Sequence, residues 1–315
     1  MSAVNEQKAV ATNAIKVLTV VDWAQTSKGK PVYVQFTRQK PPPVEATRTW
    51  RGEVLPNPPP RPPSKLPPPA CNELVVSTQN AIGQGRCGTI FAVDTMRMTN
   101  PKNPSFRLFH PRAPYLPDLV IKVAALDRAE SLAHEAAMYE EMELLQGVSL
   151  PRCYGLFTAN LPSDIVIPAL GSEKLPPLTP SNPVQSNNRQ VSILLLERVG
   201  DPLPLGDKLQ EEGDLWDVFR DLARMGIEQT DIRYSNILQA PNSSGSFPST
   251  VCPFHGTVHN YRIIDFDSAR KTDLTLKRHY FNTLEYLGPI LENMKQGVIV
   301  EPWDIKTKPD RPSAL

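Results

Sequence analysis

The order of strand-like and helix-like patterns predicts an α+β fold with two lobes. Residues 72–199 contain several short runs of β-branched and aromatic residues, such as CGTIFAVDT and VSILLLERV. Residues 200–296 instead place apolar residues at helical spacing, as in DLWDVFRDLARMGI. A strand-rich segment followed by a helix-rich segment is typical of α+β architectures. We therefore predict a β-rich N-terminal lobe and a helical C-terminal lobe.

The segments outside this main domain are predicted from their composition. Proline concentrates in residues 41–71, which favours extended polyproline II backbone over helix or paired strand. We interpret this stretch as a semi-rigid linker, and a ligand for an SH3- or WW-type partner is the alternative. Residues 1–40 are predicted as an N-terminal extension, with a β-hairpin around residues 27–30. Residues 297–315 are predicted as a C-terminal tail.

Charge and cysteine content argue against several classes of partner. The chain has 315 residues and a formal net charge of +1, which gives no support for a nucleic-acid partner. The four cysteines have no motif spacing, so we expect a reducing, intracellular and cytoplasmic location. No secretory signal is apparent, and no apolar run approaches transmembrane length. We expect no membrane partner.

A glycine motif, GQGRCG at residues 83–88, lies between two strand-like runs. A dinucleotide-binding turn would need these glycines to open a helix, but the residues TIFAV that follow are typical of a strand. A glycine turn between antiparallel strands suits a loop that covers nucleotide phosphates, because glycine lets the backbone approach them closely. Gly83, Gly85 and Gly88 are therefore candidate nucleotide-binding residues.

A lysine in an apolar strand and a glutamate on the next helix form a second candidate pair. Lys122 lies within the run LVIKVA, and a buried ammonium is costly unless it is paired. A lysine that snorkels at a strand edge is the alternative. Glu135 falls on the same helix face as Leu132 and Tyr139, so this carboxylate needs a cation. We predict that Glu135 holds Lys122 toward the α- and β-phosphates of a nucleotide.

Two acidic loops supply the remaining candidates. In DIRYSNIL, Asp231 and Asn236 have the spacing of a catalytic base and a magnesium-binding amide in a phosphoryl-transfer loop. Arg233 lies where a cation would neutralise charge on the transferred phosphoryl group. The apolar run RII ends at Asp265, and a carboxylate at a strand end suits magnesium. An ordinary turn-forming aspartate is the alternative at that position.

In this order, these motifs resemble those of the protein-kinase superfamily, and in particular of divergent fungal-type kinase-like proteins. The resemblance implies a protein-kinase-like domain over residues 72–296, with an N-lobe at 72–199 and a shortened C-lobe at 200–296. It implies ATP and Mg²⁺ as cofactors. Its hinge, where adenine binds, would lie at LERV and include Glu197 and Val199.

The resemblance also assigns roles to the candidates. Asp231 would be the catalytic base, and Asn236 and Asp265 would hold magnesium. The implied function is ATP-dependent transfer of the γ-phosphate to a hydroxyl acceptor, on a protein serine or threonine, with the acceptor itself unknown. The alternatives are a pseudokinase scaffold that binds nucleotide or partners without catalysis, and a small-molecule kinase similar to aminoglycoside phosphotransferases.

Several residues depart from the family pattern. Gln229 and Thr230 replace the usual His-Arg, and we expect the lost histidine to loosen the packing beneath Phe266. Asp267 replaces a glycine, and we interpret it as a restriction on the backbone, with an extra or alternative metal ligand as the alternative. Cys87 is interpreted as incidental.

The spacing Cys252-x-x-His255-x-x-x-His259 offers three metal ligands in a loop rich in proline, serine and glycine. A structural zinc site normally has four protein ligands. We therefore interpret this segment as a loose insert between two strands.

Overall fold

The computed structural model describes residues 9–49, 53–85, 87–108, 116–124, 126–170 and 188–304. The strands are β1 (Ile15–Thr26), β2 (Pro31–Gln39), β3 (Ala46–Thr47), β4 (Asn72–Gln84), β5 (Gly88–Asn100), β6 (Asn103–Leu108), β7 (Leu119–Ala124), β8 (Cys153–Pro162), β9 (Ile165–Val166), β10 (Asn188–Glu197), β11 (Ile227–Glu228), β12 (Ile237–Gln239), β13 (Tyr261–Ile263) and β14 (Arg270–Thr272). The α-helices within the described ranges are α1 (Ala129–Glu141), α2 (Glu212–Arg224) and α3 (Leu276–Lys295). Short 3-10 turns are η1 (Leu126–Arg128), η2 (Glu143–Leu145), η3 (Pro168–Leu170) and η5 (Tyr234–Asn236).

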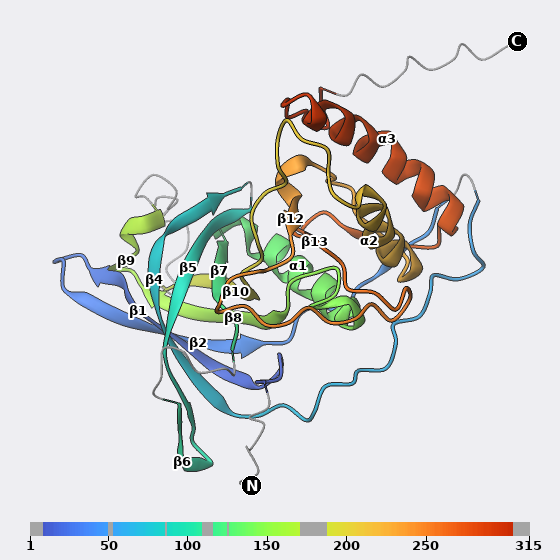
Figure 1. The fold of residues 1–315 in the computed structure, drawn as a ribbon. Helices are drawn as coiled ribbons and strands as arrows, with labels where there is room; N and C mark the ends of the chain where they lie inside the picture. Colours follow the sequence, from blue (N-terminus) through green and yellow to red (C-terminus); the bar gives the residue numbers. More distant parts are fainter. Residues whose placement is uncertain are drawn as a thin grey trace, which may run out of the picture.

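Seven strands close into a barrel in the order β1-β2-β8-β10-β7-β5-β4, and the pairing of β4 with β1 completes the ring (Figure 1). The β1–β4 pair is parallel, and the other pairs of the ring are antiparallel. The predicted two-lobed, protein-kinase-like fold with a shortened helical C-lobe is therefore wrong. The prediction failed because it placed residues 1–40 outside the domain, whereas their two strands complete the barrel.

The barrel interior is an apolar core to which the N-terminal strands contribute large side chains. The ring of Trp23 on β1 lies 5.9 Å from that of Phe36 on β2 and 6.5 Å from that of Phe91 on β5, measured between centroids. All three side chains are almost fully buried. The barrel therefore shares one core among strands that come from both sides of the proline-rich stretch.

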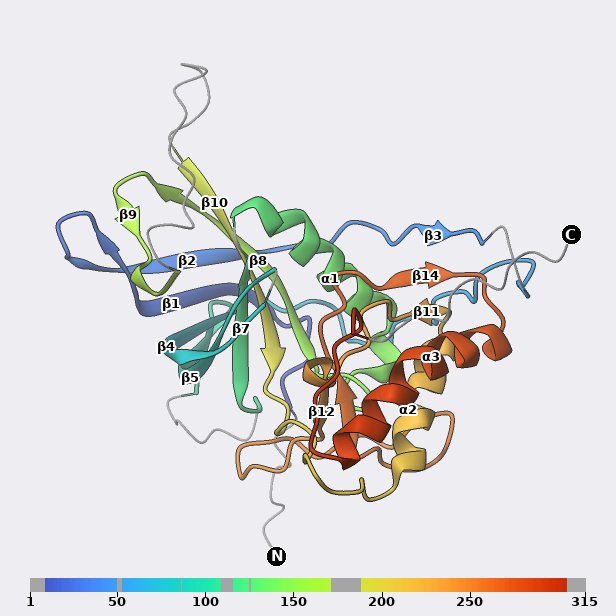
Figure 2. The same ribbon diagram turned by 90° about the horizontal axis from the view of Figure 1, so that it is seen from above.

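A second apolar core lies outside the barrel, where α1 sits between the barrel and helices α2 and α3 (Figure 1, Figure 2). Two small sheets complete this part, one formed by β12 and β13 and the other in the order β11-β14-β3. Within the described part of the chain, no helix has both the length and the apolar character needed to cross a membrane.

The proline-rich stretch is tied to both parts of the molecule. Its strand β3 pairs in parallel with β14, and the backbone N–H of Lys65 donates to Glu143 Oε1 at 2.9 Å. The side chain of Asn13 donates to the carbonyl oxygen of Pro67 at 2.6 Å. The predicted SH3- or WW-type partner of this stretch stays a prediction.

The predicted glycine loop joins β4 to β5, and its last glycine lies against β7. A Cβ atom added to Gly88 would be 2.0 Å from the carbonyl oxygen of Val123, whereas one added to Gly85 would meet nothing within 4 Å. We expect Gly88→Ala to lower the free energy of unfolding by about 1–3 kcal/mol, because the strands must separate. Gly85→Ala should change it by less than about 0.5 kcal/mol. Denaturant unfolding measures both, and equal effects would contradict this packing.

Candidate functional site

Lys122 lies between two carboxylates on the outer face of the barrel. Along β7, Leu119, Ile121 and Val123 belong to the barrel core, so the side chain of Lys122 points out toward α1. Its Nζ donates to Glu135 Oε2 and to Asp265 Oδ1, each at 2.7 Å.

Both members of the predicted pair are buried. Lys122 is 6% exposed and Glu135 is 1% exposed, so the lysine does not snorkel into solvent. The structure brings the two predicted side chains together.

Burial disfavours the charge on each of these two groups, and ion pairing opposes that effect. Burial lowers the pKa of Lys122, but the carboxylates of Glu135 and Asp265 outweigh burial and raise it above its ordinary value. Burial raises the pKa of Glu135 to about 7, although the Lys122 ammonium lowers it. The lysine therefore keeps its proton, and a fixed positive charge faces the loop that carries Asp265.

Three carboxylates gather beside this ammonium. Asp231, Asp265 and Asp267 each offer an oxygen, and these oxygens all lie within 4.8 Å of one another. Asp231 follows β11, and the other two follow β13. Asp265 already pairs with Lys122 and Asp231 with Arg233, and the carboxylate oxygens of the cluster are the ligand type that Mg²⁺ prefers. The residues present therefore fit a magnesium ion.

The backbone at Asp265 is strained. Its φ is 62°, in the left-handed region that residues other than glycine seldom adopt, although aspartate tolerates it better than most. Such conformations persist where the surrounding structure holds them, and they are common at functional sites. The carboxylate of Asp267 joins the acidic cluster, which favours the alternative of a metal ligand over a backbone restriction at this position. The position of Asp267 two residues after Asp265, in the same loop, was the feature of the sequence that could have indicated this.

Arg233 and Asn236 both hold Asp231. Arg233 Nε donates to Asp231 Oδ1 at 2.8 Å, and its Nη2 donates to Oδ2 at 2.6 Å. The amide of Asn236 donates to the carbonyl oxygen of Asp231 at 3.0 Å. These predicted residues therefore lie in one loop around Asp231.

Gln229 links the two acidic loops. Its Nε2 donates to the carbonyl oxygen of Asp265 at 2.9 Å, and its Oε1 accepts from the backbone N–H of Asp231 at 3.3 Å. Phe266 is fully buried, and its ring meets that of Tyr139 edge-on at 5.3 Å. The expected loosening beneath Phe266 is therefore not seen, because the glutamine supplies both a donor and an acceptor.

Cys87, interpreted as incidental, lies at this site. Its thiol donates to the Asp267 carboxylate and is 3.3 Å from the hydroxyl of Ser131 on α1. The end of the glycine loop therefore touches the acidic cluster. The position of Cys87 within the glycine motif was the signal for this contact.

Glu197, at the end of β10 and predicted to lie in the adenine-binding hinge, pairs with Arg152. Its buried carboxylate accepts from Arg152 Nη1 at 2.6 Å and from the Arg152 backbone N–H at 3.0 Å. Gly83 lies near the end of β4 and pairs with Ile90 on β5, and Gly85 lies in the turn that follows. Val199 follows β10 without a described contact to Lys122 or the three aspartates. The nucleotide-binding roles of these four residues stay predictions.

The arrangement can attract and orient a polyanion that carries a divalent metal, since an ammonium and three carboxylates share one small region. Comparison with protein-family models gives no match, and comparison with curated proteins gives no significant match. The resemblance to protein kinases stays a prediction, and the functional proposal depends on this geometry.

Proposed function

We propose that this chain binds Mg²⁺ and ATP and transfers the γ-phosphoryl group of ATP to a hydroxyl acceptor. The observation that carries the proposal is the single charged cluster of Lys122, held by Glu135, beside three converging aspartates. Phosphoryl transfer depends on positioning and on neutralising charge, for which a lysine, acidic metal ligands and a base suffice. The proposal depends on the site and does not require a two-lobed fold.

Each residue has a chemical role in this proposal. Asp265, Asp267 and Asn236 would hold the magnesium ion, which when bound neutralises charge on phosphate oxygens. Lys122 would contact the α- and β-phosphates, and its hydrogen bond to Glu135 would orient the ammonium for that contact.

Asp231 would be the catalytic base. The acceptor oxygen bonds to the γ-phosphorus, the bond from that phosphorus to the β–γ bridging oxygen breaks, and the electron pair leaves with ADP. The proton of the acceptor hydroxyl passes to the Asp231 carboxylate. Arg233, now bound to Asp231, would stabilise charge on the transferred group.

Purified full-length protein with Mg²⁺ and γ-labelled ATP tests this proposal. Mg-ATP should raise the melting temperature, and label should pass to the chain itself, to a generic protein or to a small hydroxyl compound. Asp231→Asn should lower transfer by about 100- to 10,000-fold, because it removes the base. It should retain the nucleotide-induced rise in melting temperature.

The control is Asp127→Asn, since the side chain of Asp127 is 73% exposed just before α1. This variant should retain both binding and transfer. Binding without transfer in the wild type would favour the scaffold alternative. If millimolar Mg-ATP did not raise the melting temperature of the wild type, that result would contradict both the phosphotransferase proposal and the nucleotide-binding scaffold.

A further inference from the structure

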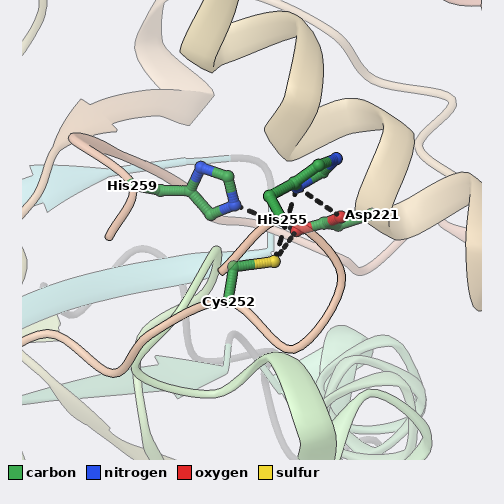
Figure 3. Close-up of side chains that lie close together, drawn as sticks. All are labelled: Asp221, Cys252, His255 and His259. Carbon is green, nitrogen blue, oxygen red and sulfur yellow. Dashed lines mark hydrogen bonds and ion pairs between the residues drawn. The ribbon is translucent and has the colours of Figure 1, made fainter. Parts of the chain in front are cut away.

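A second cluster of metal-binding side chains lies between α2 and the segment 240–260 that joins β12 to β13 (Figure 3). Asp221 Oδ2 lies 3.0 Å from Cys252 Sγ and 3.1 Å from His259 Nε2. Asp221 Oδ1 lies 3.3 Å from His255 Nδ1, which in turn lies 3.5 Å from Cys252 Sγ. All four residues place a ligand atom within 4.8 Å of every other.

These separations match a tetrahedral zinc site. Ligand atoms about 2.0–2.3 Å from a zinc ion stand about 3.3–3.6 Å from one another. Four of the six ligand pairs have contacts of 3.0 to 3.5 Å, one of them through the other oxygen of Asp221, so small side-chain movements make room for the ion. One thiolate, two imidazoles and one carboxylate suit Zn²⁺ better than Mg²⁺ or Ca²⁺, which prefer oxygen ligands.

The charges also balance. Thiolate and carboxylate together carry two negative charges, and two neutral imidazoles add none, so a divalent cation makes the site neutral. Asp221 is 0% exposed, and a buried carboxylate needs such compensation. Binding would release the thiol proton of Cys252 and the Nε2 proton of His259, which has a carboxylate at each ring nitrogen in the metal-free chain.

A carboxylate behind His259 orients that ring for a metal. His259 Nδ1 lies 2.5 Å from Asp214 Oδ1, and Asp214 Oδ2 accepts from the backbone N–H of Asn260 at 2.7 Å. Histidines that bind metals usually donate their other ring N–H to a carboxylate in this way. Asp214 and Asp221 are seven positions apart, two turns along one face of α2, so the helix supplies both the ligand and the orienting group.

The surrounding segment is packed against the rest of the molecule. Arg262 is almost fully buried, and its guanidinium donates to the carbonyl oxygen of His259 at 3.1 Å and to the hydroxyl of Ser249 at 2.5 Å. Cys252 and His259 are each 1% exposed. The interpretation of this segment as a loose insert is therefore wrong.

We propose that Asp221, Cys252, His255 and His259 bind one Zn²⁺ ion with a structural role. All four ligands come from the protein and leave no open position for substrate, which is typical of structural sites. The ion would fasten the segment 240–260 to α2. That segment leads into β13 and on to the acidic cluster, so zinc would stabilise the loops of the candidate site without taking part in its chemistry.

Metal analysis of the full-length chain, purified without a polyhistidine tag or chelator, tests this proposal. We expect about one zinc per chain by mass spectrometry. Cys252→Ser and His259→Gln should each reduce zinc at least tenfold. Cys71→Ser, which changes a partly exposed cysteine outside the cluster, should leave the zinc content unchanged.

Cobalt substitution in the wild-type chain covers the case in which these variants fail to fold. Co²⁺ should give tetrahedral d–d bands and a thiolate-to-cobalt charge-transfer band, and added Zn²⁺ should displace both. A zinc chelator, with Mg²⁺ in excess, should lower the melting temperature, and added zinc should restore it. A folded wild-type chain without zinc, without the thiolate band and unaffected by the chelator would overturn the proposal, and histidine–carboxylate pairs alone would then fill the cluster.

Discussion

Lys122→Met is expected to lower the free energy of unfolding by about 3–5 kcal/mol and to abolish detectable binding of Mg-ATP. Lys122 is the cation that pairs with Glu135, which is 1% exposed, so its removal leaves a buried carboxylate without compensation. The same change removes the positive charge beside Asp265. Denaturant unfolding measures the first effect, and a thermal shift with Mg-ATP measures the second.

The loss of stability in Lys122→Met should depend on pH. The pKa of Glu135 is already raised to about 7 by burial, and loss of the ammonium raises it further. A carboxyl group whose pKa is raised by folding contributes stability at low pH and loses it as the pH rises through the raised value. Below about pH 7 the Glu135 carboxyl is protonated in both folded chains, so the gap between wild type and variant should stay nearly constant there and widen as the pH rises above about 7.

Two further variants check this explanation. Lys122→Met combined with Glu135→Gln should recover part of the lost stability, because the buried charge is gone. Lys102→Met, at an exposed lysine, should change stability by less than about 0.5 kcal/mol. A gap that does not vary with pH would contradict the assignment of the loss to Glu135.

Trp23→Ala is expected to cost about 3–5 kcal/mol, because it removes a large side chain from the barrel core. Trp23 is 4% exposed and packs against Phe36 and Phe91, from two other strands of the ring. Tyr33→Ala is the matched control, since Tyr33 on β2 is 74% exposed and should cost less than about 0.5 kcal/mol. Denaturant unfolding of both variants measures the difference.

Deletion of residues 1–40 extends the same test. The truncated chain should fail to fold, because β4 and β8 would each lose one of their two neighbouring strands and expose an unpaired edge. If the truncated chain folded stably and cooperatively, the two N-terminal strands would be dispensable. That result would contradict a closed barrel that needs β1 and β2.

For residues close together along the chain, the sequence was enough to predict that their side chains share one site. The apolar run around Lys122 and the helical stripe that contains Glu135 are local patterns, and these two residues are thirteen positions apart. Asp231, Arg233 and Asn236 lie within a single loop. Their shared environment follows from short-range spacing and from the cost of burying a charge without a partner.

Closure of the barrel could not be predicted in the same way. Periodicity identifies a strand but does not name its neighbour, and β2 pairs with β8 across more than a hundred positions. The proline-rich stretch between β2 and β4 is typical of a linker between domains. The parallel pairing of β1 with β4, on either side of that stretch, was therefore not predicted. Asp221 was missed as a ligand for a similar reason, since it lies 31 positions before Cys252 on another element.

The barrel also constrains how the nascent chain can mature. Strand β2 is made early, but its partner β8 begins at Cys153 and the last strand of the ring ends at Glu197. The ribosome must therefore pass Glu197 before the ring can close. Contacts this distant slow folding, and unsatisfied strand edges invite association with other chains. We expect the newly made N-terminal strands to depend on chaperones until synthesis passes β10.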